Sequence, residues 1–471
     1  MSISAIKIAN VHGTVDQRRT PALKALLIIL MTVLLIDMAA GLGVSIGYGL
    51  SGKNILLYVL LIIISLRAAT DSRGLHFSDL DVHARFLSLI IYAMVTIFIA
   101  SIFSPTYDSF LGIKTLKNQL LDLYLFMFVY CYGVDRRVDY VDILRFIVIT
   151  VMILSFITLI DFLNIPDLGL IGTHKGRIEG PFGSANQYGA LLAFLLPLTL
   201  TTMRPEIRKW KKSLWLLGVL IMGALLLATG SRGAFVSTVV GSGIGVFLLR
   251  RFLDMRQVAK FAAVAFGFFV VFVIIFLIFN ADLIMDRLEK TTSGNIYVAS
   301  AGRLEIWTTA ILIMLEWPLS FLVGNGWNSF GASGIWKSAH NEYVDRFYEL
   351  GVIGLALFAS LLYTVTIRVR RRIAEADDES RRILIGYVFS MSIVVVNIFF
   401  SGLPDTWVVI WIISGLIMGI QKTLMPEEMP VRVKNKTAAT QSPAKPIEKP
   451  AGKMSMRDFR ASDTPGGARA S

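Results

Sequence analysis

Apolar runs about as long as a bilayer is thick recur along this chain of 471 residues. A helix needs about 20 mostly apolar residues to cross the hydrocarbon core of a membrane. The chain is 55% hydrophobic and 17% charged, whereas soluble domains average about 45–50% apolar and about 25% charged residues. The sequence therefore predicts an all-α, polytopic integral membrane protein. We place about twelve transmembrane helices at 23–43, 54–69, 86–103, 119–134, 143–164, 187–203, 213–229, 233–249, 260–279, 349–369, 383–402 and 406–420.

Alternate connections between these spans differ in their positive charge. The set that includes the N-terminus holds 25 Lys and Arg residues, and the opposite set holds 11, five of them in one long loop. Cytoplasmic loops carry the excess of Lys and Arg, so we expect both termini in the cytoplasm. The net charge of +13 is then a topology signal, and we expect the lipid bilayer as a partner and no nucleic acid.

The same reading divides the chain into five parts. Residues 1–22 form a cytoplasmic N-terminus, and 23–279 form transmembrane helices 1–9, the first of them an uncleaved helix rather than a signal peptide. Residues 280–348 form a large outer loop with short helices, 349–420 form helices 10–12, and 421–471 form a disordered cytoplasmic tail. The tail is rich in Pro, Lys, Ala, Ser and Thr, and such a composition does not bury enough apolar surface to fold. Cys131, the only cysteine, excludes an intrachain disulfide.

Three outer connections differ from ordinary linkers. The first runs Gly-Arg-Ile-Glu-Gly-Pro-Phe-Gly-Ser-Ala-Asn-Gln-Tyr-Gly from Gly176, and Ser184 with Gln187 predicts a capping box before the sixth span. The second is the turn Gly-Ser-Arg-Gly at 230–233. The third is the long loop, where the apolar spacing over 303–316 predicts an amphipathic helix on the membrane surface and where Ser-Ala-His-Asn-Glu-Tyr ends at Tyr343.

Spans six, eight and ten all begin at the outer face in this topology. Helix N-termini present free N–H groups and a partial positive charge, so they bind anions. Each lies near an arginine, namely Arg177, Arg232 or Arg303, and the guanidinium group suits bidentate phosphate recognition. We therefore expect an outward-facing diphosphate site, although a single outer-loop arginine is more often a headgroup anchor or a loop ion pair.

Histidines and acidic residues offer further candidates. His340, beside a helix N-terminus, is the better general base, with His174 as the alternative, and Glu342 opposes the bias of His340 toward its neutral form. His12, His76 and His83 are expected to be solvated on the cytoplasmic side. Asp37, Asp122 and Asp161 lie within or at the outer ends of spans, where acids are costly and are functional candidates.

The order of these motifs resembles the O-antigen ligase superfamily, which includes repeat-unit polymerases of surface polysaccharides. The resemblance rests on Gly-Arg-x-x-Gly-x-Phe-x-x-x-Asn from Gly176, on Gly-Ser-Arg-Gly, on Gly-Arg-x-x-x-Trp from Gly302 and on His-Asn-Glu-Tyr with Glu-Leu-Gly-Val-Ile-Gly ending at Gly354. It implies a bacterial inner-membrane glycosyltransferase with a periplasmic active site. The donor is a polyprenyl-diphosphate-linked glycan, the acceptor is a glycan or the lipid A–core, and the enzyme is inverting, metal-independent and without cofactors.

The resemblance also assigns roles to residues. It implies that His340 and Arg232 are catalytic, that Arg177, Arg232 and Arg303 bind the diphosphate, and that four neighbours support them: Asn186, Asn341, Glu342 and Tyr343. We expect an O-antigen ligase; the alternative is a repeat-unit polymerase of the same superfamily. A transporter of polysaccharide or lipid-linked glycan is a third hypothesis, but such proteins carry their distinctive charges near the membrane midplane.

Overall fold

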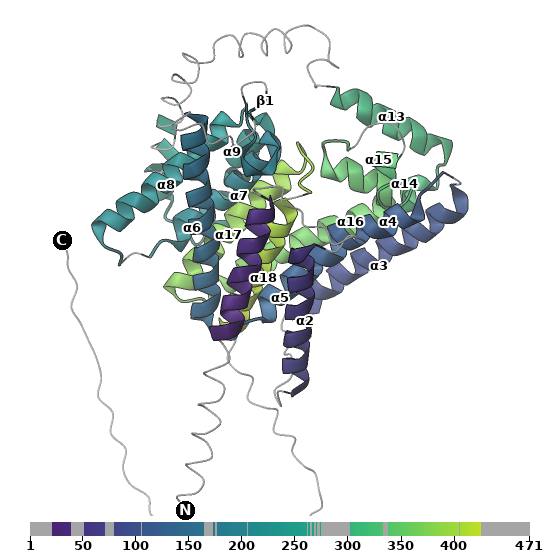
Figure 1. Ribbon diagram of the computed structural model, residues 1–471. Coiled ribbons are helices and arrows are strands. Elements are labelled where there is room, and N and C mark those ends of the chain that lie inside the picture. Colours follow the sequence, from purple (N-terminus) through teal and green to yellow (C-terminus); the bar gives the residue numbers. More distant parts are fainter. Residues whose placement is uncertain are drawn as a thin grey trace, which may run out of the picture. The chain divides into compact units, whose positions relative to one another are not determined.

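The computed structural model describes residues 21–38, 51–70, 80–104, 106–163, 173–174, 177–204, 206–260, 262–263, 266–267, 270, 274, 302–332, 338–404 and 406–424. Nearly all of this part of the chain is helical, as Figure 1 shows. The predicted span 260–279 lies mostly outside the described residues, as do His12, His76 and the predicted tail beyond Leu424.

The helices follow the apolar runs of the sequence. After Pro21–Met38 come α2 (Gly52–Thr70), α3 (Leu80–Phe103), α4 (Ser109–Leu116), the π-helix η1 (Lys117–Leu121), α5 (Asp122–Tyr132), α6 (Arg137–Phe162), the 3-10 turn η2 (Gly180–Phe182), α7 (Ala185–Thr202), α8 (Lys209–Ala228), α9 (Arg232–Leu249), α13 (Arg303–Glu316), α14 (Ser320–Val323), α15 (Ser329–Ala332), α16 (Glu342–Arg372), α17 (Asp378–Asn397) and α18 (Thr406–Leu424). Two short strands, β1 (Thr173–His174) and β2 (Arg177–Ile178), pair antiparallel.

Eight of the described helices are long and apolar enough to cross a membrane: Pro21–Met38, α2, α3, α6, α8, α9, α16 and α18. The prediction of several membrane-spanning helices is therefore confirmed. The predicted spans 119–134, 187–203 and 383–402 also fall on helices, namely η1 with α5, α7 and α17, but these three are outside the eight. The number twelve stays a prediction, and so does the side on which each loop lies.

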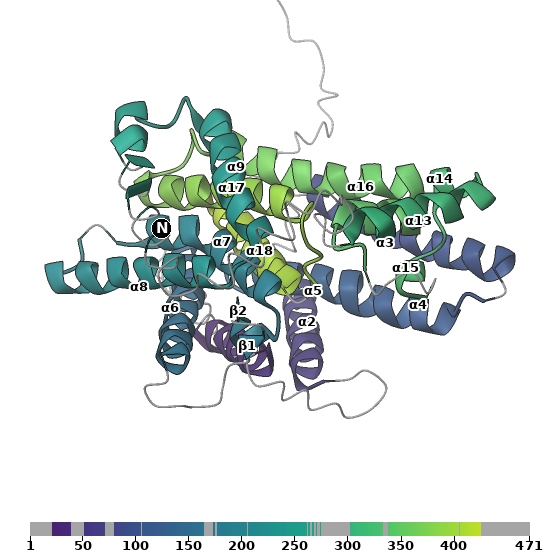
Figure 2. The same ribbon diagram turned by 90° about the horizontal axis from the view of Figure 1, so that it is seen from above.

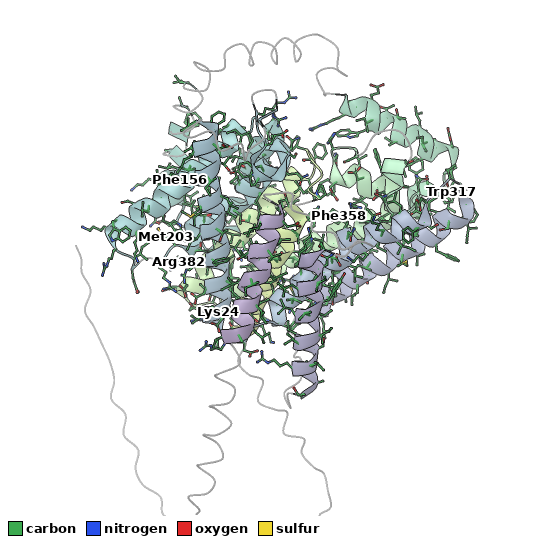
Figure 3. The ribbon with its side chains drawn as sticks, viewed as in Figure 1. Lys24, Phe156, Met203, Trp317, Phe358 and Arg382 are labelled. Carbon is green, nitrogen blue, oxygen red and sulfur yellow. The ribbon has the colours of Figure 1, made fainter. Side chains whose placement is uncertain are left out.

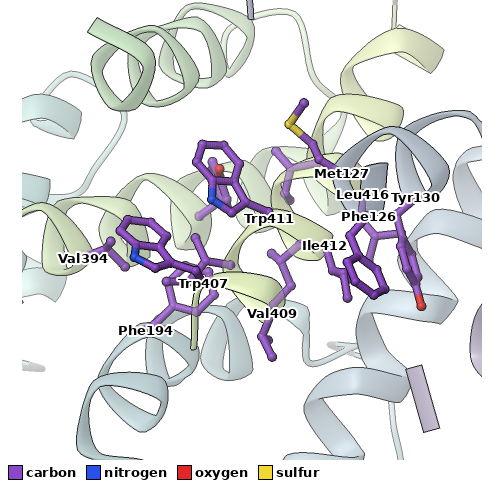
Figure 4. Close-up of a cluster of buried hydrophobic side chains, with 14 of the residues drawn as sticks. Phe126, Met127, Tyr130, Phe194, Val394, Trp407, Val409, Trp411, Ile412 and Leu416 are labelled. Carbon is purple, nitrogen blue, oxygen red and sulfur yellow. The ribbon is translucent and has the colours of Figure 1, made fainter. Parts of the chain in front are cut away.

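Helix α18 lies at the centre of the hydrophobic core and packs mainly against α5 and α6. In Figure 4, Trp407 and Trp411 point from successive turns of α18, and Phe126 and Tyr130 of α5 lie near its later turns. Every α18 residue from Val409 to Gln421 is buried. Figure 3 adds side chains to the ribbon and labels Phe358, which is buried.

Helix α16 contains a break that the sequence analysis did not predict. It begins at Glu342, seven residues before the predicted span, and Gly351 interrupts it with φ 63° and ψ −170°. The left-handed region suits glycine, and a Cβ at Gly351 would collide with the Leu322 carbonyl. The carbonyls freed by the break are not left unpaired, because Asn325 N donates to Tyr348 O (2.9 Å) and Gly326 N donates to Glu349 O (3.0 Å).

Helices α13 to α15 lie beside α16 and near the junction of α3 and α4 in both ribbon views (Figure 1, Figure 2). The predicted helix over 303–316 is confirmed as α13. It buries Ala310 and Met314, whereas Ile311 and Leu315 of the predicted apolar face are exposed, and its location on the membrane surface stays a prediction.

Two local expectations are wrong. Ser184 occupies the N-cap of α7, but its side chain makes no capping hydrogen bond, so the predicted capping box is not formed. His83 is 3% exposed rather than solvated, and Nε2 lies 3.1 Å from the Tyr132 hydroxyl. The reason is that α3 begins at Leu80, earlier than predicted, which carries His83 into the bundle.

Candidate active site

A cavity of about 280 Å³ lies where α16 begins, between residues from six parts of the chain. Its polar half contains Asn186, Gln187, His340, Glu342 and Arg346. Its apolar half is formed by side chains of α3, η1, α5, α16 and α18, including Phe86, Leu89, Leu120, Leu123, Phe358, Leu361, Trp407 and Trp411. A cavity with one polar and one apolar half matches a ligand that joins a polar head to a hydrocarbon chain.

His340 lies in a strained turn immediately before α16. Its φ is 52°, a conformation that few residues other than glycine adopt. Asp345, one turn into the helix, accepts hydrogen bonds from Ala339 N at Oδ1 (2.8 Å) and from the Ser338 hydroxyl at Oδ2 (2.9 Å), and His340 N donates to Ser338 Oγ (3.1 Å). Trp307 Nε1 donates to Ala339 O (2.9 Å). The turn is thus held from both α16 and α13.

The residues after His340 fix the start of α16. Asn341 is the N-cap, and its side chain accepts from Tyr343 N (3.0 Å) and Val344 N (3.3 Å). The Tyr343 hydroxyl donates to Val395 O (2.8 Å), and Glu342 N donates to Ile398 O (2.8 Å). Asn341 and Tyr343 therefore support the geometry of the turn and of the helix N-terminus.

A buried ion cluster forms the floor of the polar half, and the sequence analysis missed most of it. Arg346 donates to Glu342 Oε1 (2.6 Å) and to Glu349 Oε2 (2.7 Å), with both carboxylates almost fully buried. Its guanidinium carbon lies 4.1 Å from the centre of the Trp327 ring. Glu342 is thus paired with Arg346, and it is not among the causes that shift the pKa of His340.

Burial and one arginine shift the pKa of His340. Partial burial and then the positive charge of Arg303 lower the pKa of His340, which favours the neutral imidazole. Burial and the charge of Arg232 in turn lower the pKa of Arg303. Arg303 is therefore within electrostatic range of both His340 and Arg232, although neither arginine lines the cavity itself.

Arg232 is the first residue of α9 and its neighbour Ser231 is the N-cap, accepting from Ala234 N (3.3 Å). Its side chain is exposed. An exposed guanidinium at a helix N-terminus is a suitable anion contact, which fits the role that the sequence analysis predicts for it.

Arg177 has a different position from the other two predicted diphosphate ligands. Its Nε donates to Thr229 O (2.9 Å) and one terminal nitrogen donates to Asn186 Oδ1 (2.8 Å). The side chain therefore joins β2 to the start of α7 and to the end of α8. Arg177 does not line the cavity, whereas Asn186 does. Of the alternative base, His174, only the backbone is described, paired with Arg177 in the two strands.

The comparison with known protein families identifies this region. Residues 217–359 match the family model of the O-antigen ligases. This part of the chain is similar to the O-antigen ligases. No curated protein matches the chain closely enough to count as a relative.

The O-antigen ligase domain runs from α8 into α16. It includes Arg232, Arg303, His340 and the Gly351 break, and it leaves Arg177 and Asn186 outside. The resemblance drawn from the motifs is thereby confirmed. Together with the apolar helices, the O-antigen ligase domain indicates a membrane protein that acts on glycans and lipid-linked substrates in surface polysaccharide synthesis, as a ligase or a polymerase.

Proposed function

We propose that this protein transfers a glycan from a polyprenyl diphosphate to an acceptor hydroxyl at the periplasmic face of the bacterial inner membrane, as an O-antigen ligase. The observation that carries the proposal is the two-part cavity at the start of α16, within the matched domain. Its apolar half suits the polyprenyl chain near the reacting end. Its polar half joins the turn of His340, which is close to Arg303.

In the proposed reaction, His340 is the general base. The acceptor oxygen attacks the anomeric carbon as the hydroxyl proton passes to the imidazole. The bond between that carbon and the diphosphate oxygen breaks, and the diphosphate leaves with the electron pair. The lowered pKa of His340 keeps the imidazole neutral and able to accept a proton near pH 7. Attack from the face opposite the diphosphate inverts the anomeric configuration.

The leaving diphosphate gains negative charge, and the two cationic side chains near His340 are suited to stabilise it. Arg232 and Arg303 bind the diphosphate in this proposal. Arg177 supports them indirectly, because its hydrogen bond fixes the carboxamide of Asn186 at the cavity. No metal ion or cofactor takes part.

The polymerase of the same superfamily is the alternative, and the acceptor distinguishes it. Purified protein in nanodiscs is supplied with a polyprenyl-diphosphate-linked glycan and with either a lipid A–core acceptor or a second lipid-linked glycan. Transfer to the lipid A–core alone supports the ligase. Chain extension on the second lipid-linked glycan supports the polymerase. An absence of transfer to any acceptor, with stable protein and bound donor, would contradict both.

A further inference from the structure

A second cavity, of about 310 Å³, adjoins the first. The two share three lining residues, Gln119, Leu123 and Pro404, so a single wall separates them. The rest of the second cavity is formed by the end of the first helix, the start of α2, η1 and α5, and early α18, through Leu34, Met38, Ser51, Lys53, Asn54, Asn118, Asp122, Phe126 and Val408. Both volumes are near the lower end of the range for ligand pockets.

The charges of this second cavity are paired with one another. Lys53 Nζ lies 2.7 Å from Asp37, and Asp122 lies 2.9 Å from Lys117 Nζ and accepts a hydrogen bond from Tyr58 at 3.0 Å. Among its described lining residues, no cation is left without a carboxylate. The cavity therefore differs from the surroundings of His340, where two arginines lie together, and it is not suited to a diphosphate.

The cavity is nevertheless rich in hydrogen-bonding groups. Three carboxamides, Asn54, Asn118 and Gln119, line it beside the carboxylate of Asp122. A carboxamide offers two donors and an acceptor, and a carboxylate accepts from two hydroxyls. Gln119 is half-buried in the shared wall, and its side chain makes no hydrogen bond with the described part of the chain. These groups match a neutral ligand with many hydroxyls.

The backbone at the shared wall is also unusual. Gln119 is the central residue of the π-helix η1, which interrupts one continuous helix from Ser109 to Tyr132. Such π-helical turns are rare and occur frequently at functional sites. Here the turn places Asn118 and Gln119 at the second cavity and Gln119 also at the first.

We infer that the second cavity binds the sugar units of the glycan acceptor, a neutral polyhydroxylated ligand, and that Gln119 contacts them where the two cavities meet. The inference rests on the proposed function, which assigns the first cavity to the lipid-linked donor. Glycosyl transfer requires an acceptor beside the donor, and the shared wall is where two such ligands approach each other. Asp37 and Asp122 then have a structural role, because each forms an ion pair with a lysine at this cavity.

Occupancy is tested directly by cysteine protection. In a Cys131→Ser background, Asn118→Cys places a thiol at an exposed position of the second cavity, and Lys114→Cys places a matched exposed thiol on α4 outside it. We expect the acceptor oligosaccharide alone to slow maleimide labelling at position 118 by at least threefold and to leave position 114 unchanged. Equal labelling rates at position 118 with and without acceptor would overturn the inference.

The kinetic test uses Gln119→Leu, which keeps the size and the helix propensity of the side chain and removes its carboxamide, with Thr115→Ala on the same helix as the control. We expect the KM for the acceptor to rise roughly threefold to tenfold, as the loss of one or two neutral hydrogen bonds implies, with the donor KM unchanged. A change in the donor KM alone would overturn the inference. The labelling test needs no turnover, so its outcome stays distinct from a failure of the proposed glycosyl transfer.

Discussion

Replacement of Asp345 by Asn tests how the turn of His340 is held. The carboxylate receives two hydrogen bonds, from Ala339 N and from the Ser338 hydroxyl. A bond to a charged group contributes about 1.5–3 kcal/mol and a neutral one about 0.5–1.5 kcal/mol, so the substitution weakens the pair by about 2–3 kcal/mol. The strained backbone conformation of His340 costs on the order of 1–3 kcal/mol. The two weakened hydrogen bonds therefore no longer stabilise the turn clearly more than this strain destabilises it.

We therefore expect Asp345→Asn to lower kcat by roughly tenfold to a hundredfold, since about 1.4 kcal/mol corresponds to a factor of ten. Donor affinity should change little. The assay is transfer by purified protein in nanodiscs, with donor binding measured separately. In a His340→Ala background the substitution should cause no further loss, because its effect acts through that imidazole. An additive loss in the double variant, or weakened donor binding, would refute the reasoning.

Three further predictions concern pH, metal ions and topology. Arg303→Gln removes a positive charge that lowers the pKa of His340, so the pKa of the base should rise. The acidic limb of the pH profile of kcat/KM, where the base becomes protonated, should therefore move to higher pH. An unchanged limb would contradict an electrostatic effect of Arg303 on His340. EDTA should not inhibit transfer, and inhibition reversed by Mg²⁺ or Mn²⁺ would contradict metal independence. In a Cys131→Ser background, a cysteine at Ser338 should react with an impermeant maleimide from the periplasm and one at Ser213 should not; the reverse pattern would invert the topology.

Local signals in the sequence predicted two of the helix starts around the candidate site, those of α7 and α9, whereas α16 begins seven residues before its predicted span. Helices α7, α9 and α16 begin directly after Ser184, Ser231 and Asn341, because small polar residues before an apolar run are typical N-caps. The side chains of Ser231 and Asn341 make capping bonds, and that of Ser184 makes none. The apolar spacing of α13 was likewise sufficient to predict a helix within the long loop.

The buried ion cluster could have been found from the sequence. Glu342, Arg346 and Glu349 are separated by four and three residues, the spacing that places side chains on one face of a helix. We assigned Glu342 and Arg346 to a loop instead, because the predicted tenth span begins only at Glu349. Helix α16 extends in the N-terminal direction beyond its apolar part, and the break at Gly351 depends on contacts with Leu322 and Gly324 that are remote in sequence.

The cavities themselves could not be predicted. Phe86 and Trp411 are more than three hundred residues apart in the chain, yet their rings lie 4.7 Å apart at the apolar half of the first cavity. Apolar periodicity predicts that such residues are in helices but not which helices pack together. The π-helical turn at Gln119 is equally invisible in a sequence that reads as regular helix.

The central claim is that His340 acts as the base in a glycosyl transfer from a lipid-linked donor. Its most direct test compares wild type and His340→Ala in nanodiscs, with the binding of a polyprenyl-diphosphate-linked glycan and its transfer to the acceptor measured on the same preparations. We predict that the variant binds donor like wild type and that its turnover falls on the order of 10²–10⁴-fold. Near-normal turnover by His340→Ala would contradict the account and would transfer the role of base to another residue, with His174 the first to test.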